Sequence, residues 1–433
     1  MKKVYCLGII WCYCLALLAQ DYDTYFIGNM ADATPSPQGG VCLMGGATED
    51  DNAMRWFLNR ASGGDILVLR ASQSDGYNNY FYSELGVSVN SVETIVFNNA
   101  NAATDAYVLS RIERAEAIWF AGGDQSRYVE YWRGTSVDAA INTAIADRNI
   151  VIGGTSAGMA ILGGAYFTAE EDTVLSDEAL GDPYDNRVTV SNEPFLAIPG
   201  LEQVVTDMHY DDPSREGRHM TFLARAMTDF GSTFYGIACD EYTAVCIDES
   251  GQAQVFGAYP DYDDNAYFLV PNCSIPNNVP EQCVAGQPLT WDRNGVALTV
   301  YAVKGTPTGL YTFDTNTWET GTGGEWQYWA VNAGVLDRTM GTQPDCNMVM
   351  STTTSAAAAL VKIYPNPADD HVRIESTEAS VTYRLLDLQG RLIHTFQSAH
   401  LNYDLNVQNV PSGTYLLEWS IGHEQASRRL LIR

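Results

Sequence analysis

The sequence predicts an α/β fold, in which helices cover both faces of a parallel sheet, followed by a small C-terminal β-sandwich. Short runs of consecutive apolar residues recur between residues 40 and 153, and stretches with helical spacing separate them. Strands that are apolar throughout are typical of a parallel sheet buried on both faces. A Ser-, Thr- and Ala-rich tract at 351–359 then precedes alternating residues that are typical of antiparallel strands.

The expected elements follow one another along the chain. Strands are expected at 40–43, 65–70, 92–97, 117–120 and 149–153. Helical spacing is found at 52–61 and 102–114, and again at 215–223 after a strand-like stretch at 203–208. These elements define a domain at 20–304, with its α/β core from about residue 39. Residues 305–350 are rich in Gly, Thr and Trp and are expected to form an appended β or irregular segment.

The N-terminus has the layout of a cleaved signal peptide, at 1–19. Lys2 and Lys3 precede an apolar stretch, and the sequence after residue 19 is polar. The alternative, a transmembrane anchor, is disfavoured because the stretch is shorter than the roughly 18 residues that a membrane span needs. We therefore expect a mature protein that begins near Gln20 and has no transmembrane segment.

The composition restricts the partners of the protein. Asp and Glu outnumber Lys and Arg by 53 to 24, which gives a formal net charge of −29. Nucleic acids and anionic membranes bind clustered Lys and Arg, so neither is expected as a partner. The acidity is consistent with a cationic substrate or, more simply, with a solubilising surface on an exported protein.

The cysteines indicate disulfides rather than a metal site. Three of the nine lie within the expected signal peptide, which leaves an even number in an exported chain. We expect a disulfide between Cys273 and Cys283, which flank a Pro- and Asn-rich loop. The sequence has no C-x-x-C pair or other metal-ligand spacing.

Ser156 is the candidate nucleophile. It lies in a G-x-S-x-G motif, Gly154 to Gly158, between an apolar strand and a run of small, helix-compatible residues. In this setting the serine sits on a tight turn at the carboxyl edge of the sheet, with its hydroxyl exposed. The N–H of Ala157, at the start of the next helix, can donate to an oxyanion.

Histidine is scarce, which limits the choice of a general base. The six histidines are His209, His219, His371, His394, His400 and His423, and the last four follow the tract at 351–359. Of the two that share a domain with Ser156, we prefer His209 because it ends a strand-like stretch, at the sheet edge where sites form. His219 lies in a helix-like stretch. So few histidines also disfavour most zinc enzymes.

The third member of such a site should be a carboxylate that orients the imidazole. Between Ser156 and His209 the chain offers Glu170, Glu171, Asp172, Asp177, Glu178, Asp182 and Asp185. Residue types alone do not choose among them. A second glycine-rich turn at 122–125 follows another strand, where backbone N–H groups can approach a ligand closely, although a purely structural turn is the alternative.

These motifs together resemble the signature blocks of cyanophycinase and its relatives. The blocks are MGGATED at 44–50, FAGGDQ at 120–125, GGTSAG at 153–158, D-x-H-Y at 207–210 and GIACDE at 236–241. They occur in the family's order and cover about residues 39–260. The more distant aspartyl dipeptidase E shares the serine elbow and the histidine. The resemblance implies a flavodoxin-like or glutamine-amidotransferase-like sheet, a peptide substrate with an aspartyl linkage, and no cofactor.

The resemblance also implies roles for individual residues. Ser156 matches the nucleophile and His209 the general base. Glu178 matches the family's acid, because Ser176-Asp177-Glu178 fits its Ser-x-Glu context. Glu171 is the second choice, because this chain has extra residues at 181–192. Gly123 and Asp124 would lie beside the oxyanion hole with Ala157, and Gln125 would contact the substrate.

Arginines after the histidine bind the acidic backbone of the β-aspartyl-arginine polymer in cyanophycinase. Arg215 and Arg218 match two of them, whereas Pro213 replaces another. This departure leaves the exact substrate open.

The C-terminal module at 360–433 resembles the C-terminal sorting domain of the type IX secretion system of Bacteroidetes. The matching features are YPNP at 364–367, LLDLQGR at 385–391, PSGTYLLE at 411–418 and a basic end at 428–433. The resemblance implies passage through the periplasm to the outer surface or the medium, with the type IX machinery as a partner. The alternative is an ordinary carbohydrate-binding or adhesion sandwich.

The sequence therefore predicts an exported serine peptidase that hydrolyses β-Asp-Arg or related Asp-X bonds through Ser156, His209 and a carboxylate. The alternatives are an α-aspartyl dipeptidase and a secreted binding protein that keeps the fold without catalysis. An amidotransferase-like hydrolase is disfavoured because such an enzyme has a cysteine at the position of Ser156.

Overall fold

The computed structural model describes residues 20–344, 346, 360–378, 381–387, 391–421 and 424–433. The expected signal peptide at 1–19 and linker at 351–359 lie outside these residues. The chain divides into two compact units, Met1–Asp345 and Cys346–Arg433, which are described separately.

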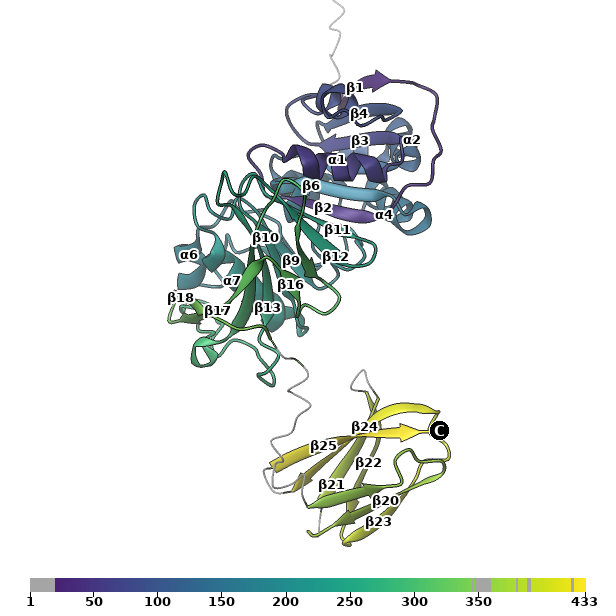
Figure 1. Ribbon diagram of the computed structural model, residues 1–433, viewed down its shortest axis with the longest axis vertical. Coiled ribbons are helices and arrows are strands. Elements are labelled where there is room, and N and C mark those ends of the chain that lie inside the picture. Colours follow the sequence, from purple (N-terminus) through teal and green to yellow (C-terminus); the bar gives the residue numbers. More distant parts are fainter. Residues whose placement is uncertain (1–19, 345, 347–359, 379–380, 388–390, 422–423) are drawn as a thin grey trace, which may run out of the picture. The chain divides into compact units, whose positions relative to one another are not determined.

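The larger sheet of the first unit has a parallel centre, as expected (Figure 1). Its strands are, in spatial order, β1 (Tyr22–Gly28), β4 (Ser91–Phe97), β3 (Asp65–Arg70), β5 (Ala117–Phe120), β6 (Val151–Thr155), β2 (Gly40–Met44), β11 (Ala244–Asp248), β12 (Gln252–Phe256), β15 (Tyr311–Asp314) and β16 (Gly321–Thr322). Strands β4, β3, β5, β6 and β2 run parallel, and the strands on either side of them pair antiparallel. The edge strand β1 was not expected from the sequence.

Helices cover both faces of this sheet because its strands are apolar on both. In β3, Ile66 and Val68 face one side, and Leu67 and Leu69 face the other. The first side packs against α1 (Asp51–Arg60) and the π-helix η1 (Tyr80–Glu84). The second packs against the short helix η2 (Ala100–Thr104) and against α2 (Ala106–Arg114), α3 (Gln125–Trp132), α4 (Ser136–Arg148) and α5 (Ala157–Ala160). The α/β class is therefore confirmed.

A second, smaller sheet was not expected. Its order is β18 (Val335–Met340), β17 (Gly324–Asn332), β14 (Leu298–Lys304), β13 (Asn265–Pro271), β10 (Tyr235–Cys239) and β9 (Val204–Asp207). Only β9 and β10 pair in parallel among these strands. One face packs against α6 (Ser176–Gly181) and α7 (Glu216–Phe230), and the other shares a core with β11, β12 and β15 of the larger sheet. The remaining short elements are β7 (Tyr166–Phe167), β8 (Val190–Ser191) and η3 (Arg293–Gly295).

The predicted boundary at residue 304 is corrected. Strand β15 pairs with β12 in the larger sheet, and β17 pairs with β14 in the smaller one. The stretch after residue 304 is thus β-structured as far as Met340, but it completes both sheets instead of forming an appendage. The first unit continues to Asp345.

The second unit consists of two antiparallel sheets around one core. The strands are β19 (Val361–Tyr364), β20 (His371–Ser376) and β23 (Asn402–Asn406) in one sheet, and β22 (Leu392–Ser398), β21 (Val381–Leu386), β24 (Gly413–Ile421) and β25 (Glu424–Ile432) in the other. Val372 and Ile374 from the first sheet and Leu417 and Trp419 from the second belong to the shared core. The expected small β-sandwich is therefore present.

The expected disulfide between Cys273 and Cys283 is wrong. Cys273 is disulfide-bonded, whereas Cys283 is a free, buried thiol and so is not its partner. A loop with a cysteine at each end is not sufficient, because a disulfide needs the two Cα atoms within about 7 Å of each other. Within the described residues, no helix is long and apolar enough to cross a membrane.

Candidate active site

Ser156 occupies the turn between β6 and α5, at the carboxyl edge of the larger sheet. Its backbone has φ 52° and ψ −120°, and its N–H donates to the carbonyl of Met44 over 3.1 Å. The flanking glycines let the helix pack directly on the sheet. A Cβ on Gly154 would lie 2.6 Å from the backbone of Gly158, and a Cβ on Gly158 would collide with the carbonyl oxygen of Phe120.

His209 follows β9, whose carboxyl end lies beside the same site. Its φ is 46°, and its N–H donates to the carbonyl of Gly45 over 2.9 Å. The neighbouring Gly46 faces the imidazole, and a Cβ on it would collide with Cε1 and Nε2. Two glycines of the block at 44–50 therefore position His209. The carbonyl of Gly45 accepts its backbone N–H, and Gly46 leaves room for its ring.

Three side chains form a continuous hydrogen-bonded chain. Nε2 of His209 lies 2.8 Å from Oγ of Ser156, and Nδ1 lies 2.5 Å from Oε1 of Glu241. Glu241 follows β10, the strand that pairs with β9, and its backbone N–H donates to Asp211 over 2.9 Å. About a fifth of the His209 and Glu241 side chains is exposed, 22% and 21% respectively, so a substrate can reach the site.

The carboxylate beside His209 is thus Glu241, and the choice of Glu178 or Glu171 is corrected. Glu178 accepts the N–H of Leu175 over 2.9 Å and pairs with Arg187 over 2.8 Å. These two interactions, in that order, lower the pKa of Glu178. Glu171 is exposed in a turn. Glu241 ends the GIACDE block at 236–241, which follows His209 in the chain and so lies outside the stretch between Ser156 and His209.

His219 is a structural residue of α7. Its side chain is fully buried, with Nδ1 3.2 Å from the Tyr210 hydroxyl and Nε2 3.1 Å from the carbonyl of Val205. Burial lowers its pKa to about 4, so the ring is neutral at physiological pH. His219 thus contacts Tyr210 and Val205, whereas Nε2 of His209 lies 2.8 Å from Oγ of Ser156.

The second glycine-rich turn lies next to Ser156. A Cβ on Gly122 would come within 3.5 Å of Cβ of Ser156. Gly123 has φ 153°, and the Asp124 side chain caps α3 by accepting the N–H of Ser126 over 3.0 Å. Ala157 is the first residue of α5. The backbone N–H groups of this turn and of Ala157 are therefore candidates for binding an oxyanion.

Two open hollows meet at the Ser156–His209 pair. One, of about 540 Å³, is lined by the predicted residues Gly123, Asp124, Gln125, Ala157, Arg215 and Arg218. The other, of about 600 Å³, is lined mainly by Glu49, Arg70, Tyr77, Tyr80 and Glu84. A peptide could thus extend to both sides of the serine.

The two predicted arginines differ in availability. Arg218 is buried and forms a two-pronged pair with Asp207, at 2.9 and 2.5 Å. Burial would raise the pKa of Asp207, but the charge of Arg218 outweighs it and lowers this pKa. Arg215 is half-buried, donates to the carbonyl of Met208 over 3.1 Å, and has a pKa lowered to about 10, mainly by burial and then by Arg218. Of these two arginines, Arg215 is therefore the one whose guanidinium a ligand in the hollow can reach.

Asp240, the neighbour of Glu241, is an unusual buried carboxyl. It is 4% exposed, and its Oδ1 has no hydrogen-bond partner in the described part of the chain. Its Oδ2 accepts the N–H of Asn265 over 2.8 Å. Burial raises the pKa of Asp240 to about 7, so its charge changes near neutral pH.

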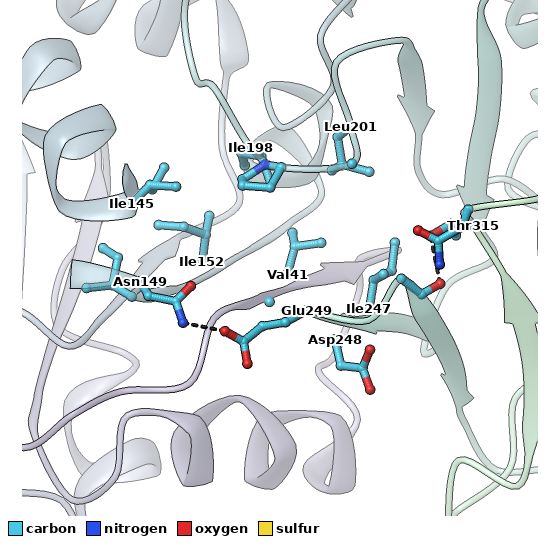
Figure 2. Close-up of a pocket in the computed structure, with 16 residues that line it drawn as sticks. Val41, Ile145, Asn149, Ile152, Ile198, Leu201, Ile247, Asp248, Glu249 and Thr315 are labelled. Atoms are coloured by element: carbon cyan, nitrogen blue, oxygen red, sulfur yellow. Dashed lines mark hydrogen bonds between the residues drawn. The ribbon is translucent and has the colours of Figure 1, made fainter. Parts of the chain in front are cut away.

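A third hollow, of about 350 Å³, lies beside the amino ends of β2 and β6, whereas Ser156 follows the carboxyl end of β6 (Figure 2). Aliphatic side chains including Val41, Ile152 and Ile247 line it, and Asn149 donates a hydrogen bond to Glu249 at its rim. It contains neither Ser156 nor His209.

Comparison with known proteins gives two family matches. Residues 70–255 match peptidase family S51, and residues 362–433 match the secretion system C-terminal sorting domain. A cyanophycinase of Synechococcus elongatus is 25% identical over 228 residues, which are 51% of this chain and 66% of the relative. A cyanophycinase of Trichormus variabilis is 23% identical over 227 residues, 50% of this chain and 70% of the relative. This chain thus spans about two thirds of the length of these relatives.

Solved structures resemble the chain only distantly. The superposition on a peptidase from an acI-B1 actinobacterium has a TM-score of 0.39 and 15% sequence identity. It covers 52% of this chain and 89% of that peptidase. The superposition on a putative peptidase E protein from Listeria monocytogenes has a TM-score of 0.32 and 17% sequence identity. It covers 51% of this chain and 99% of that protein. The family matches are more informative than these structures: residues 70–255 match peptidase family S51, and the match of residues 362–433 to the C-terminal sorting domain indicates export to the cell surface or secretion.

Proposed function

We propose that this chain is an exported serine peptidase that hydrolyses peptide bonds next to aspartyl residues, either β-Asp-Arg or a related Asp-X linkage. One observation carries the proposal: His209 lies within hydrogen-bonding distance of both Ser156 Oγ and Glu241 Oε1, at 2.8 and 2.5 Å. A nucleophile, a base and a group that orients the base are the parts of a serine hydrolase. The similarity to cyanophycinases supports the aspartyl substrate.

In the proposed mechanism, Ser156 Oγ attacks the carbonyl carbon while its proton passes to Nε2 of His209. Glu241 accepts a hydrogen bond from Nδ1–H, which fixes the tautomer and stabilises the imidazolium. The oxyanion faces the N–H of Ala157 and the turn at 122–123. The imidazolium then protonates the leaving nitrogen as the C–N bond breaks. A water molecule, deprotonated by His209, hydrolyses the acyl-enzyme and regenerates the serine.

Arg215 is proposed to bind the aspartyl carboxylate of the substrate. It lines the hollow beside Ser156, and a guanidinium suits a carboxylate because it can donate two parallel hydrogen bonds. Arg218 is proposed to hold the wall of that hollow instead. Besides pairing with Asp207, it donates to Thr173 and Val174, each over 3.4 Å.

The test is hydrolysis of a substrate panel by the full exported chain and by Ser156→Ala. The panel contains β-Asp-Arg polymer and α-Asp and iso-Asp dipeptides. Loss of the hydroxyl should reduce kcat/KM by about 10³-fold or more for whichever member is cleaved. The matched control is Ser110→Ala, which removes an exposed hydroxyl on α2 and should leave activity unchanged.

The outcomes separate the candidate functions. Equal turnover by the wild type and Ser156→Ala would reject the nucleophile. Preference for α-linked dipeptides would favour an α-aspartyl dipeptidase. Binding without turnover of any member would favour a silent binding protein. The C-terminal domain is proposed to be the part recognised by the type IX secretion machinery.

A further inference from the structure

Two cysteines face each other across the centre of the larger sheet. Cys42 is the middle residue of β2 and Cys246 the middle residue of β11, and the two are direct partners in the antiparallel register. Their sulfur atoms lie 3.5 Å apart. The Ser156 mechanism uses neither thiol.

The hydrogen-bond pattern defines the kind of pair they form. Gly45 follows Cys42 by three residues, and Thr243 precedes Cys246 by three. The N–H of Gly45 donates to the carbonyl of Thr243 over 2.9 Å. Hydrogen-bonded and non-hydrogen-bonded pairs alternate along an antiparallel ladder, so Cys42 and Cys246 form a non-hydrogen-bonded pair. The Cα atoms of such a pair are about 4.5 Å apart and its side chains are close together. This separation lies within the range of about 4.4 to 6.8 Å that a disulfide spans.

The other free thiols of the first unit lack this arrangement. Cys239 stands opposite Ala266 in the smaller sheet, and its sulfur lies 3.6 Å from the carbonyl of Leu43. Cys283 packs in the core beside α7. Within the described residues, these two are therefore natural internal controls for a cysteine that is buried but not paired.

We propose that Cys42 and Cys246 are a covalent cross-link site, and that they are joined by a disulfide in the exported protein. Two observations carry this: the facing geometry of the thiols and the sorting domain at 362–433. Exported proteins pass through compartments in which disulfides form and persist. The proposal does not depend on the peptidase activity.

The chemistry is thiol–disulfide exchange. One thiol, as its thiolate, attacks a disulfide-bonded oxidant, which leaves as a thiol, and the second cysteine then displaces the oxidant's other sulfur. Two S–H bonds are lost, one S–S bond forms, and the oxidant disulfide is reduced to two thiols. Both cysteines are fully buried, and burial raises the pKa of Cys246 well above its usual value. The exchange should therefore precede the packing of α1 over β2 and β11.

The cross-link would join the two strands whose adjacent loops hold His209 and Glu241. Strand β2 leads into Gly45 and Gly46, and β11 begins shortly after Glu241. Beyond the cysteine pair, the N–H of Tyr242 donates to the carbonyl of Gly46 over 3.2 Å. A bond between the strands would limit separation of the two loops that hold His209 and Glu241.

The test reads the state of each cysteine in the exported full-length protein. The protein is denatured without reductant, its free thiols are alkylated with a light reagent, and it is then reduced and alkylated with a heavy one. We expect heavy label on Cys42 and Cys246 and light label on Cys239 and Cys283. Light label on both Cys42 and Cys246 would overturn the proposal.

Two variants exclude accidental pairing. In Cys246→Ala, Cys42 should change from heavy to light label. In the matched variant Cys239→Ala, which also removes a buried sulfur, Cys42 and Cys246 should remain heavy. Heavy label on Cys42 in Cys246→Ala would mean that Cys42 has another partner, and would also overturn the proposal. The wild-type measurement decides the question even if a variant fails to fold.

Discussion

Ser156 and His209 share an uncommon backbone conformation. Both have positive φ, 52° and 46°, although neither is glycine. Such conformations are rare for residues with a Cβ and persist where neighbouring interactions hold them. Here the carbonyls of Met44 and Gly45 bind the two backbone N–H groups. The loop after β2 therefore fixes the directions of the Ser156 and His209 side chains.

The acid of the site can be identified by a matched pair of substitutions. Glu241→Gln should lower kcat by about 10²- to 10⁴-fold, because a neutral amide stabilises the imidazolium less well and permits the wrong tautomer. Glu178→Gln should leave kcat within about twofold, because Glu178 contacts Arg187 and Leu175 and not His209. Steady-state kinetics on the cleaved substrate checks both. A larger loss in Glu178→Gln would contradict the assignment.

Asp240 should make stability depend on pH. Its folded pKa of about 7 exceeds its ordinary value of 3.8, so the folded state holds the proton more tightly. The resulting stability is fully present below about pH 4 and is lost as pH rises through 7. Asn cannot ionise, so the free energy of unfolding of Asp240→Asn should rise by on the order of 4 kcal/mol relative to the wild type between pH 4 and pH 8.

Urea denaturation at pH 4 and pH 8 measures the effect of Asp240→Asn. The control is Asp75→Asn, which changes an exposed carboxylate and should show no such difference. If Asp240→Asn changes the free energy of unfolding by the same amount at both pH values, the prediction is wrong.

At the scale of elements, the serine turn depends on contact between α5 and the sheet. Gly158→Ala should destabilise the protein by about 1 to 3 kcal/mol, because its Cβ would collide with the backbone of Phe120. Gly181→Ala is the control, because its Cβ would meet nothing within 4 Å and its φ is not positive. Calorimetry should show a lower Tm only for Gly158→Ala. An unchanged Tm would mean that α5 moves away from the sheet at little cost.

Sequence patterns predicted some elements well and others poorly. The strands at 65–70 and 117–120 match β3 and β5, because continuous apolar residues are typical of strands buried on both faces. Strand β1 is half-exposed at an edge, and its run Tyr22–Gly28 lacks that apolar signal. The stretch after residue 304 shows no clear period, because the buried residues of β17 are the three consecutive residues 329–331 and do not alternate with exposed ones.

At the scale of the whole molecule, the two compact units have separate tasks. Deletion of residues 361–433 should abolish export while the first unit keeps its thermal transition, because the sorting domain has its own core. Cell fractionation and calorimetry measure the two effects. By contrast, a chain that ends at Lys304 should lose its cooperative transition, because it lacks the partners of β12 and β14. Export of the 361–433 deletion at the wild-type level would contradict the assignment of the tail.

The sequence by itself determined the α/β class and singled out Ser156 and His209 as candidate site residues. These rest on local signals: apolar strands, a motif of five residues, and the scarcity of histidine before residue 351. Only the tertiary structure placed Glu241 beside His209, paired Arg218 with Asp207, and paired the strands after residue 304. Those features depend on which strands become neighbours, as β10 does for β9, and neighbours far apart in the chain leave no local pattern.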